Sequence, residues 1–121
     1  MYIDMSNKLN VYLAGKISGN DNYKEDFDNA IKKLSIHKNL NIINPLDNGL
    51  GNNPQDWVPA MKSDIKKLVD CDILVDIENG TENSRGVMLE KIIAVSLDIK
   101  IVRLSDFLAQ LSMQTAFIER I

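Results

Sequence analysis

The sequence predicts an α/β protein with one parallel sheet and helices on both faces of that sheet. Three observations lead to this fold class. Short apolar runs alternate four times with longer segments of helical periodicity, and this alternation is typical of a parallel sheet covered on both sides. Glycine or proline ends the first two apolar runs. The length of 121 residues, of which 45% are hydrophobic, suits a single domain with its own core.

The first half of the chain is expected to contain two strands and one helix. Residues 9–15 (LNVYLAG) form a continuous apolar run that glycine ends, and residues 40–45 (LNIINP) form a second run that proline ends. Between them, residues 23–36 carry apolar side chains three or four positions apart. This spacing predicts a helix whose buried side consists of Phe27, Ala30, Ile31 and Leu34.

The second half repeats the alternation after a polar loop. A helix is expected to end near Val69, although Pro59 could delay its start and leave Trp57 in the preceding loop. The remaining elements are, in order, a strand at 72–77 (DILVDI), a helix opened by Ser84, a strand at 100–104 (KIVRL), and a helix from Asp106 with Phe107, Leu111 and Ile118 on its apolar side.

The composition excludes several classes of function. Seventeen acidic against fourteen basic residues give a net charge of −3, so the chain has no basic field that would attract duplex nucleic acid or an anionic membrane. A single cysteine, Cys71, excludes an internal disulfide framework and a multi-cysteine zinc site, and we expect a buried thiol. The first ten residues lack the basic and apolar regions of a signal peptide, and no apolar run approaches a membrane span. We therefore expect a soluble, cytoplasmic protein with a small ligand.

Two carboxylates are unusual because the helical pattern places each of them on an apolar side. Glu90 is expected to share a helix face with Gly86, Ile93, Ala94 and Leu97, and Asp64 with Trp57, Ala60, Met61 and Leu68. A carboxylate among apolar neighbours needs hydrogen-bond partners, or its pKa rises until it is neutral. Each one alone could be structural, as a cap, a partner of a lysine or an anchor of a loop. Together they indicate a pair in which one ionises and the other keeps a proton, which suits cleavage of a glycosidic bond.

The loops after the strands provide further candidates, because ligands of parallel α/β sheets bind at the carboxyl ends of the strands. This rule selects GKISG at 15–19, NPLDNG at 44–49 and ENGTENSRG at 78–86. Ser84 can cap the helix that follows it and can also hold a phosphate there, whereas Gly86 can simply allow close packing. Lys16 lies between glycines in a loop that lacks the pattern of a nucleotide P-loop.

Four segments together resemble a known family: VYLAGKISG, the NP after the second strand, the spacing W...M..D...L..CD, and SRGVMLE. They are similar to the nucleoside 2-deoxyribosyltransferase-like superfamily, in particular to small phage and bacterial proteins of the DUF4406 type and to 2'-deoxynucleoside 5'-monophosphate N-glycosidases. The resemblance covers roughly residues 9 to 104. It implies a flavodoxin-like or Rossmann-like sheet, a homodimer or higher homo-oligomer, and cleavage of the bond between a base and its sugar without a metal or an organic cofactor.

The resemblance also assigns roles to individual residues. Glu90 matches the nucleophilic glutamate and Asp64 the acid/base aspartate. Lys16 stands where DUF4406-type relatives have proline, and Ser18 stands where the monophosphate N-glycosidases have arginine, whose charge the lysine can supply. The C-terminal segment AQLSMQT offers no clear match to the residue that a neighbouring subunit contributes in this family. The implied binding residues for sugar, phosphate and base are Tyr12, Gly15, Lys16, Ser18, Asn44, Trp57, Ser84, Arg85 and Gly86.

These observations lead to one expected function and two alternatives. The expected protein is an N-glycosidase or transferase that acts on a (deoxy)nucleoside or its 5'-monophosphate, with water or a second base as the acceptor. The first alternative is a non-catalytic module that binds or sequesters a nucleotide, and the second is a scaffold without a pocket. We also expect a homo-oligomer that packs through the Ser84 helix and the C-terminal helix, because the Ser84 helix is apolar nearly all round, with Met88, Leu89, Ile92 and Val95 away from Glu90.

Overall fold

The sheet has four parallel strands, in agreement with the predicted fold class. The computed structural model describes the backbone of residues 8–120 and the side chains of residues 8–115. The strands are β1 (Leu9–Ala14), β2 (Leu40–Ile43), β3 (Ile73–Asp76) and β4 (Lys100–Arg103). They lie in the order β2-β1-β3-β4, and each neighbouring pair is parallel. Flavodoxin-like sheets begin with the same order.

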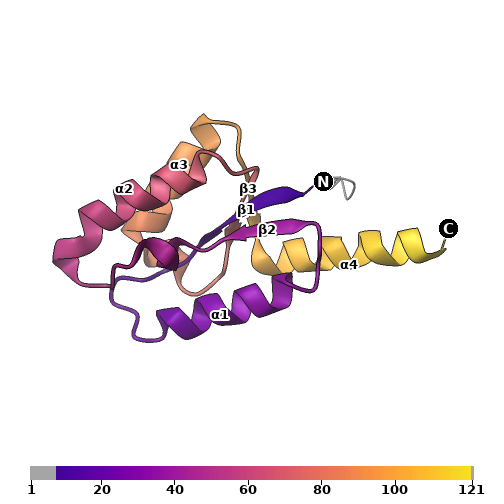
Figure 1. Cartoon of the computed structure of the whole chain (residues 1–121), viewed down its shortest axis with the longest axis horizontal. Helices are drawn as coiled ribbons and strands as arrows, with labels where there is room; N and C mark the ends of the chain where they lie inside the picture. The colour runs from indigo at the N-terminus through magenta and orange to yellow at the C-terminus, as the bar shows by residue number, and fades with distance from the viewer. Residues whose placement is uncertain (1–7, 121) are drawn as a thin grey trace.

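Helices cover both faces of this sheet (Figure 1). Helices α1 (Tyr23–Leu34) and α4 (Leu104–Arg120) lie on one face, and α2 (Trp57–Leu68) and α3 (Arg85–Ser96) lie on the other. Alternate side chains of β1 therefore enter two cores. Val11 and Leu13 pack with α1 and α4, and Tyr12 and Ala14 pack with α2 and α3. A strand that is buried on both faces reads as a continuous apolar run, which is why the sequence predicted it without alternation.

Helix α2 starts where the sequence predicts, and helix α4 starts earlier than predicted. Pro59 does not delay α2, which starts at Trp57, because proline is tolerated in the first turn, where the N–H groups have no partner within the helix. Helix α4 starts at Leu104, directly after β4, instead of at Asp106. The carboxylate of Glu78 accepts a hydrogen bond of 2.7 Å from the Ser105 N–H, so a residue from another loop caps this helix.

The predicted polar loops contain short 3-10 helices. Two of them, η1 (Pro45–Asn48) and η2 (Pro54–Asp56), lie between β2 and α2, and η3 (Thr81–Asn83) lies between β3 and α3. Both η1 and η2 begin with proline, whose fixed φ suits a first helical position. In α4 the predicted stripe residues Phe107 and Leu111 are fully buried, whereas the side chain of Ile118 lies outside the described ones.

The sheet order determines where a ligand can bind. The connection after β1 leads to β2 on one side, and the connection after β3 leads to β4 on the other. Such a reversal opens a crevice at the carboxyl ends of the two central strands. Over the described part of the chain, no helix is both long enough and apolar enough to cross a membrane.

Candidate active site

A cavity of about 350 Å³ lies at the carboxyl ends of the strands, on the side of α2 and α3. Its walls come from the loop after β1, the connection between β2 and α2, and the first turns of α2 and α3. The structure thus brings together segments that are far apart in the sequence. Most of the predicted site residues line this cavity: Gly15, Ser18, Trp57, Asp64, Ser84, Arg85, Gly86 and Glu90.

Glu90 lines the cavity and is held in place by Tyr12. Its side chain extends from α3 and only 5% of the residue is exposed. The phenolic O–H of Tyr12, a fully buried residue of β1, donates a hydrogen bond to Oε2 of Glu90. Burial raises the pKa of Tyr12 well above its usual value, and the charge of Glu90 adds to this shift. Tyr12 therefore stays a hydrogen-bond donor over the whole working pH range.

Burial also raises the pKa of Glu90 itself, to about 8. The hydrogen bond from Tyr12 works against this shift, and the negative charge of Asp64 adds to it. A carboxyl group in such a place is protonated at neutral pH, because its charged form has lost most of its solvation.

Asp64 is the second buried carboxylate of the cavity. It extends from α2, is 4% exposed, and accepts a hydrogen bond of 3.2 Å from Nδ2 of Asn48. Burial raises its pKa to about 6, while the bond from Asn48 and the positive charge of Lys67 limit the rise. At pH 7 the free protein therefore carries an ionised Asp64 and a protonated Glu90. If Glu90 is the nucleophile and Asp64 the acid, the opposite protonation states are needed: an ionised Glu90 and a protonated Asp64.

The first turn of α3 supplies the cationic part of the cavity. Ser84 caps the helix and accepts a hydrogen bond of 3.2 Å from the Val87 N–H. The guanidinium of Arg85 stacks on the ring of Trp57, with its Cζ atom 3.7 Å from the ring centroid. Among the described residues, Arg85 is the only lysine or arginine that lines the cavity, and its N–H groups form no hydrogen bond with another described residue. The stack holds a cation beside the free N–H groups of a helix N-terminus, which is a favourable place for an anion.

Two glycines of the site have close neighbours. A Cβ at Gly86 would lie 3.1 Å from Sδ of Met61, so glycine lets the start of α3 approach α2 closely. A Cβ at Gly15 would lie 2.6 Å from Ile77 and 2.7 Å from Phe27. Any side chain at Gly15 would displace core residues and with them the loop after β1.

The family model with the description Domain of unknown function (DUF4406) matches residues 9–103. The chain belongs to the DUF4406 family. The matched residues include every residue that lines the cavity, from Leu13 to Glu90.

The DUF4406 fold also occurs among solved structures. One structure that matches is described as the crystal structure of a conserved protein from Enterococcus faecalis V583, with a TM-score of 0.62 and 19% sequence identity. The match covers 79% of this chain and 62% of that one. At this identity the likeness concerns the fold alone. The comparison with curated proteins returned no match.

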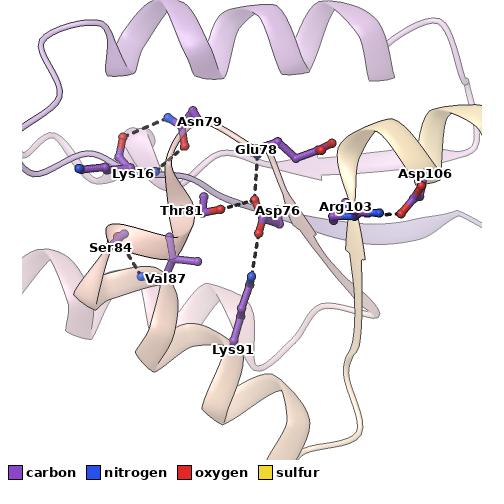
Figure 2. A network of polar contacts seen from close by, with 10 residues as sticks. All are labelled: Lys16, Asp76, Glu78, Asn79, Thr81, Ser84, Val87, Lys91, Arg103 and Asp106. Carbon is purple, nitrogen blue, oxygen red and sulfur yellow. Dashed lines mark hydrogen bonds and ion pairs between the residues drawn. The ribbon is translucent and has the colours of Figure 1, made fainter.

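Three of the predicted site residues of this DUF4406 protein do not line the cavity. Tyr12 lies behind Glu90, and Asn44 caps η1 by accepting a hydrogen bond of 3.0 Å from the Leu46 N–H. Lys16 is held through its main chain by the side chain of Asn79, which accepts from the Lys16 N–H at 2.8 Å and donates to the Lys16 carbonyl at 3.2 Å (Figure 2). The positive charge in the cavity therefore comes from Arg85 and not from Lys16.

Asp76 was not predicted as a site residue from the sequence, and it organises the connection between β3 and α3. Its carboxylate accepts hydrogen bonds from Lys91 Nζ at 2.7 Å, Thr81 Oγ1 at 2.7 Å and the Glu78 N–H at 2.8 Å (Figure 2). Burial alone would raise the pKa of Asp76, but these donors outweigh burial and lower it. An ionised Asp76 thus fixes the turn that leads to Ser84. A strand ending in aspartate was the only sequence signal for this role.

Two further observations complete the chemistry of the DUF4406 site. Cys71 is buried, as predicted, and burial raises the pKa of its thiol to about 11, so it is unreactive at neutral pH. Within the part of the chain that the structure describes, no group of three or more histidine, cysteine, aspartate or glutamate side chains is placed to hold a metal ion.

Proposed function

We propose that this protein cleaves the N-glycosidic bond of a (deoxy)nucleoside or its 5'-monophosphate, as members of the nucleoside 2-deoxyribosyltransferase-like superfamily do. The observation that carries the proposal is the pair of buried carboxylates, Glu90 and Asp64, which face one cavity from two helices. Both have raised pKa values, and perturbed carboxyl groups in a cavity are typical of acid–base and nucleophilic chemistry. The resemblance of SRGVMLE and its companion segments adds support.

The chemistry would proceed by double displacement. Oε of ionised Glu90 bonds to C1' of the sugar, the C1'–N bond breaks with its electron pair moving to the base, and Asp64 gives its proton to the departing base. Water or a second base then attacks C1' from the opposite side, Asp64 takes up the proton of the incoming group, and Glu90 leaves. Each positioned acid, base or nucleophile typically contributes ~10²- to 10⁴-fold in rate.

This mechanism requires a minor protonation state of the free protein. The pKa values of about 8 for Glu90 and about 6 for Asp64 put the single proton of the pair mainly on Glu90. The reactive form of the pair also carries one proton, but this proton is on Asp64 and Glu90 is ionised. This form is less populated than its tautomer, because burial and the charge of Asp64 raise the pKa of Glu90 above that of Asp64. A bond from Tyr12 that favours ionised Glu90 reduces this penalty.

A 5'-monophosphate is the better candidate substrate. Arg85, Ser84 and the N–H groups at the start of α3 form a cationic end of the cavity, and a phosphate dianion gains from both the charge and the free donors. A nucleoside would leave these donors without a partner.

A second candidate is a non-catalytic module that binds or sequesters a nucleotide in the same cavity. One observation favours it: in the free protein Glu90 is protonated at neutral pH and already hydrogen-bonded to Tyr12. A neutral carboxyl group is less repulsive to an anionic ligand than a carboxylate and is not itself a nucleophile.

One experiment separates the two candidates. The protein is incubated with a panel of nucleosides and nucleoside monophosphates, and free base is measured by chromatography, with Glu90→Gln as the control. Mass spectrometry of the quenched protein then tests for a sugar attached to Glu90. Base release that depends on Glu90 supports the enzyme. Binding of a nucleotide without any release of base supports the module. A protein that neither binds a nucleotide nor releases base would refute both candidates.

A further inference from the structure

The connection between β2 and α2 forms an uncharged wall of the cavity. Every residue that it contributes between Pro45 and Pro54 is neutral, whereas Asp47 does not face the cavity. The polar members of this wall are asparagines: Asn48, Asn52 and Asn53. The chemistry of this wall therefore differs from that of the start of α3, which carries Arg85 and Ser84.

Internal hydrogen bonds hold the first part of this connection in place. The Asn48 side chain accepts a hydrogen bond of 2.8 Å from the Leu50 N–H through Oδ1, and it donates to Oδ1 of Asp64 at 3.2 Å. The turn at Gly49 needs a positive φ of 76°, which glycine adopts without strain. Asn48 thus ties the wall to the carboxylate of Asp64.

Asn52 and Asn53 have no such internal role. Neither side chain forms a hydrogen bond with another residue that the structure describes, and the Asn53 side chain does not cap η2. Each carboxamide offers two N–H donors and one carbonyl acceptor in a plane. Both residues line the cavity, and their carboxamides are free to pair with a ligand.

We propose that Asn52 and Asn53 form the subsite for a neutral heteroaromatic base. The inference rests on the proposed function, in which the base is the leaving group. Carboxamides recognise a base edge because their adjacent donor and acceptor match the adjacent acceptor and donor of the edge. An uncharged wall also suits a neutral base better than a phosphate. Since Asn48 ties this wall to Asp64, the base would sit beside the group that protonates it.

The test compares ligands with and without a base. Isothermal titration calorimetry is performed with the common deoxynucleoside 5'-monophosphates and with 2-deoxyribose 5-phosphate, which keeps the sugar and the phosphate only. The variant combines Asn52→Ala and Asn53→Ala. The matched control is Asn29→Ala, which removes an exposed asparagine from α1. Melting temperatures of all three proteins are measured, to ensure that the same folded fraction is compared.

The double variant should bind the preferred monophosphate about tenfold more weakly, as expected for the loss of two hydrogen bonds to a ligand. Its affinity for 2-deoxyribose 5-phosphate should not change, and Asn29→Ala should match the unmodified protein with both ligands. Equal affinities of the double variant and the unmodified protein for the monophosphate would overturn the inference, as would an equal loss for both ligands or a protein that binds no monophosphate at all. Selective loss of base binding without any base release would uphold this subsite and refute the proposed catalytic function alone.

Discussion

The hydroxyl of Tyr12 in β1 donates a hydrogen bond to the carboxyl group of Glu90 in α3, 78 residues further along the chain. Both groups are buried, and both have pKa values raised by that burial. The bond orients the Glu90 side chain and favours its ionised form. It therefore links the position of this carboxyl group to its protonation, and several predictions about the site depend on it.

Glu90→Gln should slow base release strongly and leave nucleotide binding intact. The amide keeps the shape of the protonated acid but cannot act as a nucleophile, so turnover should fall by about two or more orders of magnitude. Turnover and melting temperature should be measured on the same preparation. A variant that melts early but releases base at the normal rate would assign Glu90 a structural role.

The rate of base release should depend on pH with a bell shape. The reactive form carries one proton on the pair, so kcat/KM should rise through a pKa of about 6 and fall through one of about 8, with its maximum near pH 7. A profile that keeps rising above pH 8 would mean that no proton on the pair is needed.

Tyr12→Phe should lower the rate at the maximum and move the alkaline limb to higher pH. Without the bond from Tyr12 the pKa of Glu90 rises further, so the ionised form becomes rarer. Tyr23→Phe, which alters a tyrosine of α1 outside the cavity, is the matched control. Identical pH profiles for all three proteins would show that Tyr12 does not tune Glu90.

The free energy of unfolding should fall with rising pH because of Glu90. Its pKa is about 8 in the folded protein against 4.5 for the unperturbed group, so between these values the folded state holds a proton that the unfolded state has released. The contribution of this proton to the free energy of unfolding is complete below pH 4.5 and is lost progressively up to about pH 8. The loss is at most about 1.4 kcal/mol per pH unit. Urea unfolding at several pH values should show a smaller fall for Glu90→Gln between pH 6 and 8. Parallel curves for both proteins would contradict the raised pKa.

Arg85→Gln should weaken binding of a 5'-monophosphate much more than binding of its nucleoside. Arg85 lines the cavity and Lys16 does not, so Lys16→Gln is a control with the same loss of charge. Loss of a charged hydrogen bond predicts a decrease of roughly tenfold or more in affinity. Ser84→Asp should reverse the preference through repulsion between like charges. If Lys16→Gln has the larger effect, the phosphate lies in the loop after β1.

Exposed apolar side chains on α3 favour a homo-oligomer. Met88, Ile92 and Val95 are 57%, 61% and 68% exposed and follow each other at helical spacing. The sequence predicted a contact through α3 and α4 together, but these helices lie on opposite faces of the sheet. We therefore expect the contact to form through α3. Light scattering at micromolar concentration should give a mass above that of the monomer, and Ile92→Glu should reduce it. A monomeric mass for the unmodified protein would refute the prediction.

The sequence by itself determined the fold class and the faces of the helices. Continuous apolar runs and helical spacing are local properties, and they sufficed to predict the four strands and to place Glu90 and Asp64 on buried sides. The cap at Ser84 was also predictable, since it joins residues three positions apart. Three of the loops that line the cavity follow from the rule that ligands bind at the carboxyl ends of parallel strands.

Only the tertiary structure decided the partners and the charges of the site. The pairs Tyr12 with Glu90, Asn48 with Asp64, and Lys91 with Asp76 join separate elements, and no local pattern links their members. The order of the two carboxyl pKa values was likewise not predictable, because desolvation depends on how completely the packed elements exclude water from each group. For the same reason the sequence could not tell that Arg85, rather than Lys16, brings its charge into the cavity. Periodicity gives the direction of a side chain within its own helix or strand, whereas its surroundings are set by the packing of elements that are distant in the sequence.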